Sequence, residues 1–329
     1  MANKVVLITV CVAAVIVSAV LALCFGAVEL SPSELFGALT DGGTTANGRI
    51  MLYVRIPRVL GTLLCGSSLA VSGRIIQSVL GNPLASPNII GVNAGAGFFT
   101  VLCSALFPSI SSALPFTAFF GALLTVMTVY LIARKTGASK ITLVLSGVAV
   151  GSLLNAGIDT VTTFFPDVLS GITAFKIGGV SGITLEKLFP AWIIIAVGIL
   201  LAIMLSHELD VLSLGDITAQ SLGMNVKLMR FILLTIAAAL AGAAVSFCGL
   251  IGFVGLIVPH IAGNLSGNEN RITIPVCAML GAAFVTVCDL VSRTLFAPYE
   301  IPLGIVISYI GVPFFIYLLL KRKGGRHGD

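Results

Sequence analysis

The chain has 329 residues, of which 57% are apolar and 9% are charged, and its net charge is +5. Soluble domains usually contain about 25% charged residues, so this composition excludes a soluble enzyme, a nucleic-acid-binding module and a secreted disulfide scaffold. Because so much apolar sequence requires lipid as its solvent, we predict an all-α integral membrane protein with a single transmembrane domain over residues 1–329.

Apolar segments long enough to cross a bilayer as helices recur along the chain, separated by charged, proline-rich or glycine-rich breaks. The first segment is too long for the apolar region of a signal peptide, so we expect an uncleaved span. The division between the seventh and eighth segments rests on Gly249, Gly252 and Gly255. In total we predict ten spans, near residues 5–28, 59–80, 88–107, 115–133, 141–165, 189–206, 229–248, 250–265, 272–291 and 302–320.

Lysine and arginine set the expected orientation, because they collect in cytoplasmic loops. If the N-terminus lies inside, twelve of these residues fall on the inner side and six on the outer side. This division predicts cytoplasmic N- and C-termini in a multi-pass membrane protein. The outer cations, which include Arg55, Arg58 and Arg293, then need an explanation.

Three connections, at 29–58, 166–188 and 207–228, are too long to be simple turns. We expect a short helix in the second, and one or two amphipathic helices in the third, which lies on the inner side. In the third connection apolar leucines and Ile217 are interspersed with Asp210, Asp216 and Gln220. Two interpretations stay open here, a docking surface for a soluble partner and a plain interfacial helix.

Polar residues within the fifth span share one helical face, because they are spaced by three, four and three residues. They are Ser152, Asn155, Asp159 and Thr162. This face is interpreted either as part of a translocation path or as a hydrogen-bonding contact between helices. Among these four residues, the Asp159 carboxylate is the hardest to explain by contact between helices alone. At the outer end of the ninth span, Asp289 and Arg293 have the i, i+4 spacing of an ion pair.

No catalytic or metal-binding pattern stands out in the sequence. It lacks GxxxxGK[ST], HExxH and GxSxG, and none of its seven cysteines forms a CxxC pair. His260 and His207 are far apart in sequence, so we interpret His260 as a structural hydrogen-bonding residue. We therefore predict that the chain is not an enzyme and binds no cofactor or metal of its own.

Five stretches, in order along most of the chain, together resemble the FecCD-type permease subunits of ABC importers for ferric siderophores, haem and cobalamin. The sequence departs from the family pattern where charged residues are usual, at Gly81, Ser86 and Gly263, and Phe175 stands near a position where tryptophan is frequent. The five stretches are RIPRVLGTLLCGSSLAVSGRIIQSVLGNPLASPNIIGVNAGA (55–96), VLSGVAVG (144–151), DITAQSLGMNV (216–226), GLIGFVGLIVPHIAG (249–263) and DLVSRTLFAPYEIPLGIVISYIGVPFFIYLLLKR (289–322).

The resemblance implies a type II importer permease fold, a location in a bacterial or archaeal plasma membrane, and a set of partners. Two permease copies would form the channel at their interface, as a homodimer or with a related chain. Two cytoplasmic ATPase subunits would hold ATP and Mg²⁺, and an extracytoplasmic binding protein would deliver the chelate. The permease would then import a ferric siderophore, with haem and cobalamin as further candidates, by alternating access.

The resemblance also implies roles for individual residues. Arg55, Arg58 and Arg293 correspond to outer arginines that receive acidic residues of the binding protein. The pathway would be lined by the polar residues of the fifth span and by Ser308 in the tenth, and the inner gate would include Thr136 and Ser139. The residues expected to couple to the ATPase are Leu214, Gly215, Asp216, Ala219, Gln220, Leu222 and Gly223.

Two other classes of protein are alternatives to the importer. A secondary transporter driven by protons or sodium would use Asp159 as its coupling carboxylate. It would also be expected to contain inverted repeats, and no convincing internal repeat is visible. An intramembrane enzyme lacks any catalytic set of residues in this sequence.

Overall fold

The computed structural model describes residues 2–26, 37, 43–108, 113–135, 140–267 and 269–324, with side chains described outside 2–3, 169–171 and 321–324. This part of the chain is helical and contains no strand, as predicted. Eight of its helices are long and apolar enough to cross a membrane, and two shorter apolar helices accompany them. These ten helices follow the order of the ten predicted spans.

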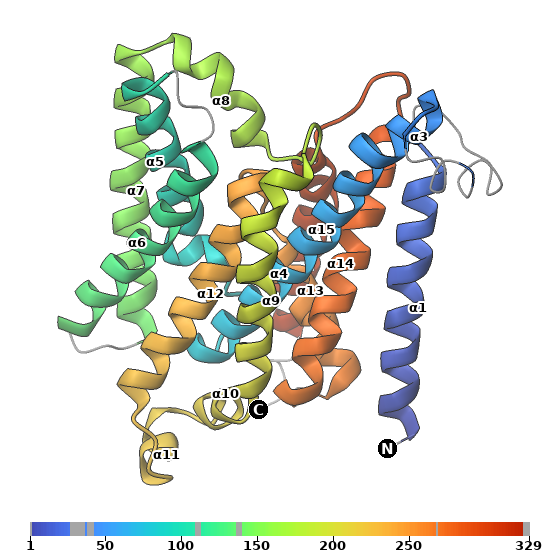
Figure 1. Cartoon of the computed structure of the whole chain (residues 1–329). Coiled ribbons are helices and arrows are strands. Elements are labelled where there is room, and N and C mark those ends of the chain that lie inside the picture. The colour runs from blue at the N-terminus through green and yellow to red at the C-terminus, as the bar shows by residue number, and fades with distance from the viewer. Residues whose placement is uncertain are drawn as a thin grey trace.

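Figure 1 shows how the helices are arranged in the bundle. The long ones are α1 (Ala2–Cys24), α4 (Ile56–Leu80), α6 (Leu114–Lys135), α7 (Lys140–Phe164), α9 (Leu185–Met204), α12 (Val226–Cys248), α14 (Asn270–Thr294) and α15 (Leu303–Gly324). The shorter ones are α3 (Ala46–Ile50), the π-helix η1 (Met51–Arg55), the 3-10 helix η2 (Pro87–Ile90), α5 (Val92–Leu106), α8 (Asp167–Ile177), α10 (Ser206–Ser213), α11 (Asp216–Ser221) and α13 (Val254–Ser266).

The second span begins earlier than the sequence predicts. We expected a connection up to residue 58, because Pro57 and two arginines interrupt the apolar pattern there. Instead, α3, η1 and α4 form one continuous candidate span, Ala46–Leu80. The π-helical turn ends at Arg55, two residues before Pro57, which has no N–H, and such local adjustments allow a helix to continue across proline.

The third and eighth spans are shorter than expected, at 15 residues for α5 and 13 for α13. The predicted start of the third span at 88 falls in the 3-10 helix η2. The predicted start of the eighth span at 250 falls in backbone that is not α-helical, where Phe253, with φ 62°, directly precedes α13. Short helices and irregular backbone are tolerated at membrane depth when protein surrounds them. Val92, Val101, Val254 and Val258 are accordingly buried.

The centre of the bundle is α4, which is buried along most of its length between α12, α13 and α14. Glycines let these backbones approach closely. A Cβ on Gly66 would lie 2.0 Å from the Gly281 carbonyl oxygen, and one on Gly73 would lie 1.9 Å from that of Gly255. Such small-residue contacts are the usual way in which membrane helices pack tightly.

Two ends of the bundle can be distinguished in Figure 1. The start of α1, the end of α15 and helices α10 and α11 lie at one end, which we call the elbow end. The start of α4 and helix α8 lie at the other, which we call the arginine end. Helix α1 stands at the side of the bundle against α14, where Lys4 forms an ion pair of 2.5 Å with Glu269.

Candidate functional site

A buried ion-pair cluster lies at the arginine end, where α4 begins and α14 ends. The Arg58 guanidinium binds both carboxylate oxygens of Asp289, with Nε–Oδ2 and Nη2–Oδ1 distances of 3.0 Å. Its Nη1 donates to Glu300 at 3.0 and 3.1 Å. The side chains of Arg58 and Asp289 are 9% and 2% exposed, whereas that of Glu300 is 38% exposed.

The other two predicted docking arginines join the same cluster. Arg293 lies one turn beyond Asp289, with an Nε–Oδ2 distance of 3.6 Å, so the pairing expected from their spacing is confirmed. Its Nη2 donates to the Ala22 carbonyl at 2.6 Å, and Arg55 donates to the Leu23 carbonyl and, at 2.9 Å, to that of Cys24. Both arginines thus bind the free carbonyl groups that end α1.

All three arginines are buried, at 3%, 8% and 4% exposure for Arg55, Arg58 and Arg293. Their hydrogen bonds are made within the chain, so the group of this cluster most open to a partner is Glu300. A cavity of about 230 Å³ adjoins the cluster and is lined by Arg58, Asp289 and Glu300 together with residues 177–181. The bond between Arg58 and Asp289 joins residues 231 apart in sequence, and no local spacing could have indicated it.

The expected helices of the 207–228 connection are present as α10 and α11, which we call the elbow and which lie at the elbow end of the bundle. Among the residues predicted to couple to an ATPase, Leu214, Gln220, Leu222 and Gly223 are exposed, Gly215 and Asp216 are half-buried, and Ala219 faces inward. Ile217 is 84% exposed, Leu222 65% and Leu214 63%, so an apolar surface is uncovered here.

A buried arginine, which the sequence analysis missed, holds this elbow. Arg230 on α12 donates to both oxygens of Asp216 at 2.7 and 2.9 Å, and its side chain is 2% exposed. A second link runs from α10, where Asp210 accepts hydrogen bonds from the Asn270 backbone N–H at 3.0 Å and side-chain amide at 2.7 Å. Arg74 on α4 donates to the same asparagine at 2.6 Å.

The polar face predicted for the fifth span lies on α7 and points away from the bundle. Ser152, Asn155 and Asp159 are exposed, and Thr162 is half-buried and donates to the Ile158 carbonyl at 3.0 Å. Helix α7 packs against α5, α6 and η2 through its other faces.

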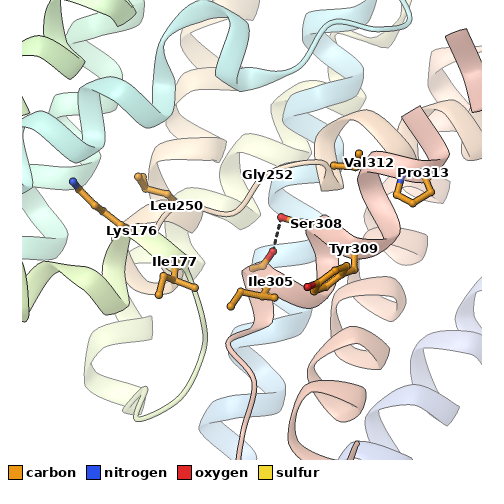
Figure 2. A pocket seen from close by; sticks show the side chains of 10 residues that line it. Lys176, Ile177, Leu250, Gly252, Ile305, Ser308, Tyr309, Val312 and Pro313 are labelled. Carbon is orange, nitrogen blue, oxygen red and sulfur yellow. Dashed lines mark hydrogen bonds between the residues drawn. The ribbon is translucent and has the colours of Figure 1, made fainter. Parts of the chain in front are cut away.

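Ser308, the predicted pathway residue of the tenth span, lines a different surface. It borders a cavity of about 620 Å³ between the end of α8, the segment before α13 and the first turns of α15 (Figure 2). Ser308 Oγ donates to the Gly304 carbonyl of its own helix at 2.7 Å, and Tyr309 beside it is 79% exposed. The α7 residues do not line this cavity, so one chain does not bring the two parts of the predicted path together.

Several further expectations concern the elbow end. Thr136 and Ser139, the predicted inner gate, lie outside the described residues. Gly81, which replaces a usual arginine, ends α4 with φ 59°, a conformation that favours glycine. Ser86 precedes η2, and Gly263 is buried in α13.

With this geometry established, comparisons with known proteins identify the family. The family model described as "FecCD transport family" matches residues 14–321. The Fe(3+)-citrate import system permease protein YfmE of Bacillus subtilis is 38% identical over 307 residues, covering 92% of this chain and 91% of that protein. The probable heme-iron transport system permease protein IsdF of Staphylococcus aureus is 34% identical, covering 98% of both chains.

A comparison with solved structures agrees with the sequence relatives. An inward-facing conformation of a metal-chelate type ABC transporter has a TM-score of 0.85 at 26% identity and covers 97% of this chain and 99% of that chain. A second structure, PsaBC from Streptococcus pneumoniae, has a TM-score of 0.62 at 16% identity and so indicates the fold alone. The match of the family model to nearly the whole chain, together with full-length relatives above 30% identity, shows that this multi-pass membrane protein belongs to the FecCD transport family.

Proposed function

We propose that the chain is the permease subunit of an ABC importer that carries an iron chelate, with a ferric siderophore as the first candidate and haem or cobalamin as further ones. The observation that carries this proposal is the similarity to permeases named for iron and haem import along more than nine-tenths of the chain. ATP and Mg²⁺ would be held by separate ATPase subunits.

A second copy of the chain would complete the channel. The exposed polar residues of α7 and the cavity beside Ser308 lie on surfaces that one chain leaves uncovered. Polar groups facing lipid are costly, which favours their coverage by another permease copy around a water-filled path. A homodimer would place two copies of each surface around one axis.

The elbow would couple the permease to its ATPases. Its exposed apolar residues, Leu214, Ile217 and Leu222, suit a cleft on a soluble partner, and the Arg230–Asp216 ion pair fixes α11 on α12. This assignment would place the elbow end and both termini in the cytoplasm.

The arginine cluster would receive the binding protein. Because the three arginines are buried, docking would require an acidic side chain of the binding protein to replace Glu300, the exposed carboxylate that now binds Arg58. Charge complementarity of this kind mainly sets the association rate and the register of docking.

The test is transport by a purified complex. The chain would be co-expressed with its candidate ATPase and reconstituted in liposomes with the binding protein, and uptake of radioactive iron as citrate, hydroxamate and haem complexes would be measured. We expect uptake only with ATP and only with a functional ATPase. Uptake that follows a proton or sodium gradient without the ATPase would instead support a secondary transporter and make Asp159 the first residue to replace.

A further inference from the structure

A second large cavity, of about 450 Å³, lies at the arginine end among α5, α6, α8, α9 and α12. It is separate from the arginine cluster and from the cavity beside Ser308, with which it shares no lining residue. Its walls are mainly apolar and are formed by Phe116, Phe119, Phe175, Phe247, Ile172 and Ile194.

One polar group of this cavity lacks a partner. Thr100 on α5 is 1% exposed, and its hydroxyl oxygen makes no hydrogen bond in the described part of the chain. Buried hydroxyl groups are nearly always hydrogen-bonded, because leaving them unpaired is unfavourable. A ligand that brings an acceptor such as a carbonyl oxygen into the cavity would satisfy Thr100.

The rim of the cavity carries charged and aromatic residues together. Glu186 and Lys187 are exposed in the first turn of α9. Phe116, a lining residue on α6, is 54% exposed. Phe189 and Trp192, which adjoin the lining residues Pro190 and Ala191 along α9, are 61% and 46% exposed, with ring centroids 6.2 Å apart. Exposed aromatic rings beside charges are typical of the level where lipid headgroups meet the hydrocarbon core.

We propose that this cavity binds one phospholipid that carries an ammonium headgroup. Its acyl chain occupies the aromatic and aliphatic walls, and an ester carbonyl accepts a hydrogen bond from Thr100. Lys187 binds the phosphate, and Glu186 binds the ammonium group. The lipid packs against α8 and α9 at once, since Ile172 and Phe175 of the first and Ala191 and Ile194 of the second line the same space.

An iron chelate suits this cavity poorly. Siderophore and haem complexes carry several charges or polar groups, which need several polar partners. Among the described residues that line the cavity, Lys187 alone is cationic, and it stands at the exposed rim rather than inside. The chemistry of the walls therefore favours an acyl chain over the transported substrate.

The experiment uses the one tryptophan of the chain, Trp192, which follows the lining residue Ala191 on α9, as the reporter. The full chain is purified in mild detergent and titrated with phosphatidylethanolamine brominated on its acyl chains, which quenches tryptophan at short range. We expect saturable quenching that is about tenfold weaker in Ala191→Phe, where the new ring fills the cavity, and severalfold weaker in Thr100→Val and Lys187→Ala. Lys135→Ala, at the far end of α6, is the matched control and should titrate like the unchanged protein.

A comparison of two headgroups tests the role assigned to Glu186. Glu186→Gln should reduce the preference for phosphatidylethanolamine over phosphatidylglycerol, because it removes the partner of the ammonium group. Each variant is first checked for a single gel-filtration peak, and Thr100→Val, which keeps the side-chain volume, stands in if Ala191→Phe does not fold. Quenching that rises in proportion to lipid and is the same in wild type, Thr100→Val and Lys187→Ala would overturn the proposal, because it reports only lipid around the surface.

Discussion

Replacing Asp289 with asparagine should destabilise the protein more than any other single change in the arginine cluster. The carboxylate is 2% exposed and lies between two buried arginines, Arg58 and Arg293. Without its charge, Arg58 keeps Glu300, but Arg293 keeps only the Ala22 carbonyl among the contacts described above. Removing one partner of a buried ion pair typically costs about 3–5 kcal/mol, and we expect a loss in this range.

Two other substitutions calibrate this loss. Arg58→Met should cost less than Asp289→Asn, because Asp289 retains Arg293 at 3.6 Å and the methionine fills part of the vacated space. Glu300→Gln should cost less than about 1 kcal/mol, since exposed ion pairs contribute little to stability. The expected order of destabilisation is therefore Asp289→Asn, then Arg58→Met, then Glu300→Gln.

The assay is unfolding of the purified chain in mild detergent, followed by circular dichroism as denaturing detergent is added. A double-mutant cycle with Arg58→Met and Asp289→Asn isolates the interaction free energy between the two side chains, which we expect to be about 1–3 kcal/mol for a contacting buried pair. If Asp289→Asn costs no more than Glu300→Gln, the cluster does not stabilise the arginine end, and the reasoning from burial is refuted.

Four further predictions address function and packing. Glu300→Gln should tighten binding of the binding protein by up to about fivefold, measured by surface plasmon resonance, because a competing ion pair worth up to about 1 kcal/mol is lost. Arg230→Met should weaken ATPase association about tenfold, or about 1.4 kcal/mol, in a pull-down titration, while leaving the binding-protein affinity unchanged. Gly281→Val should lower stability by about 1–3 kcal/mol or prevent folding, since its side chain would meet the Gly66 backbone. Asp159→Asn should leave ATP-dependent uptake unchanged. If this variant loses uptake, the result would favour a coupling role for the Asp159 carboxylate.

The helical architecture could be predicted because apolar segments of membrane length are directly visible in the sequence. The ten predicted apolar helices correspond in order to eight candidate spans and two shorter apolar helices, and the helices expected within 166–188 and 207–228 are present. It missed the extension of the second span back to Ala46, because proline and arginine interrupt the apolar pattern there. It also made the third and eighth spans too long, since hydropathy does not report where 3-10 or irregular backbone replaces an α-helix.

The arrangement of the candidate sites could be predicted from the sequence only in part. Local spacing revealed the Asp289–Arg293 pair and the polar face of α7, because both depend on helical periodicity within one segment. The bond from Arg58 to Asp289 and the bond from Arg230 to Asp216 depend on how separate helices pack. The burial of Arg55 and Arg293 likewise follows from packing against the end of α1, which residue type alone does not indicate.

These cross-helix contacts bear on how the two ends of the protein communicate. At the elbow end, Asp210 binds Asn270, the first residue of α14, and Arg74 of α4 binds the same asparagine. At the arginine end, the same two helices are joined by the Arg58–Asp289 pair. Between the ends, the close approach at Gly66 and Gly281 leaves no room for one helix to slide past the other without a clash. We therefore expect a displacement of α10 to be shared by α4 and α14 and to be transmitted to the arginine cluster through these direct contacts.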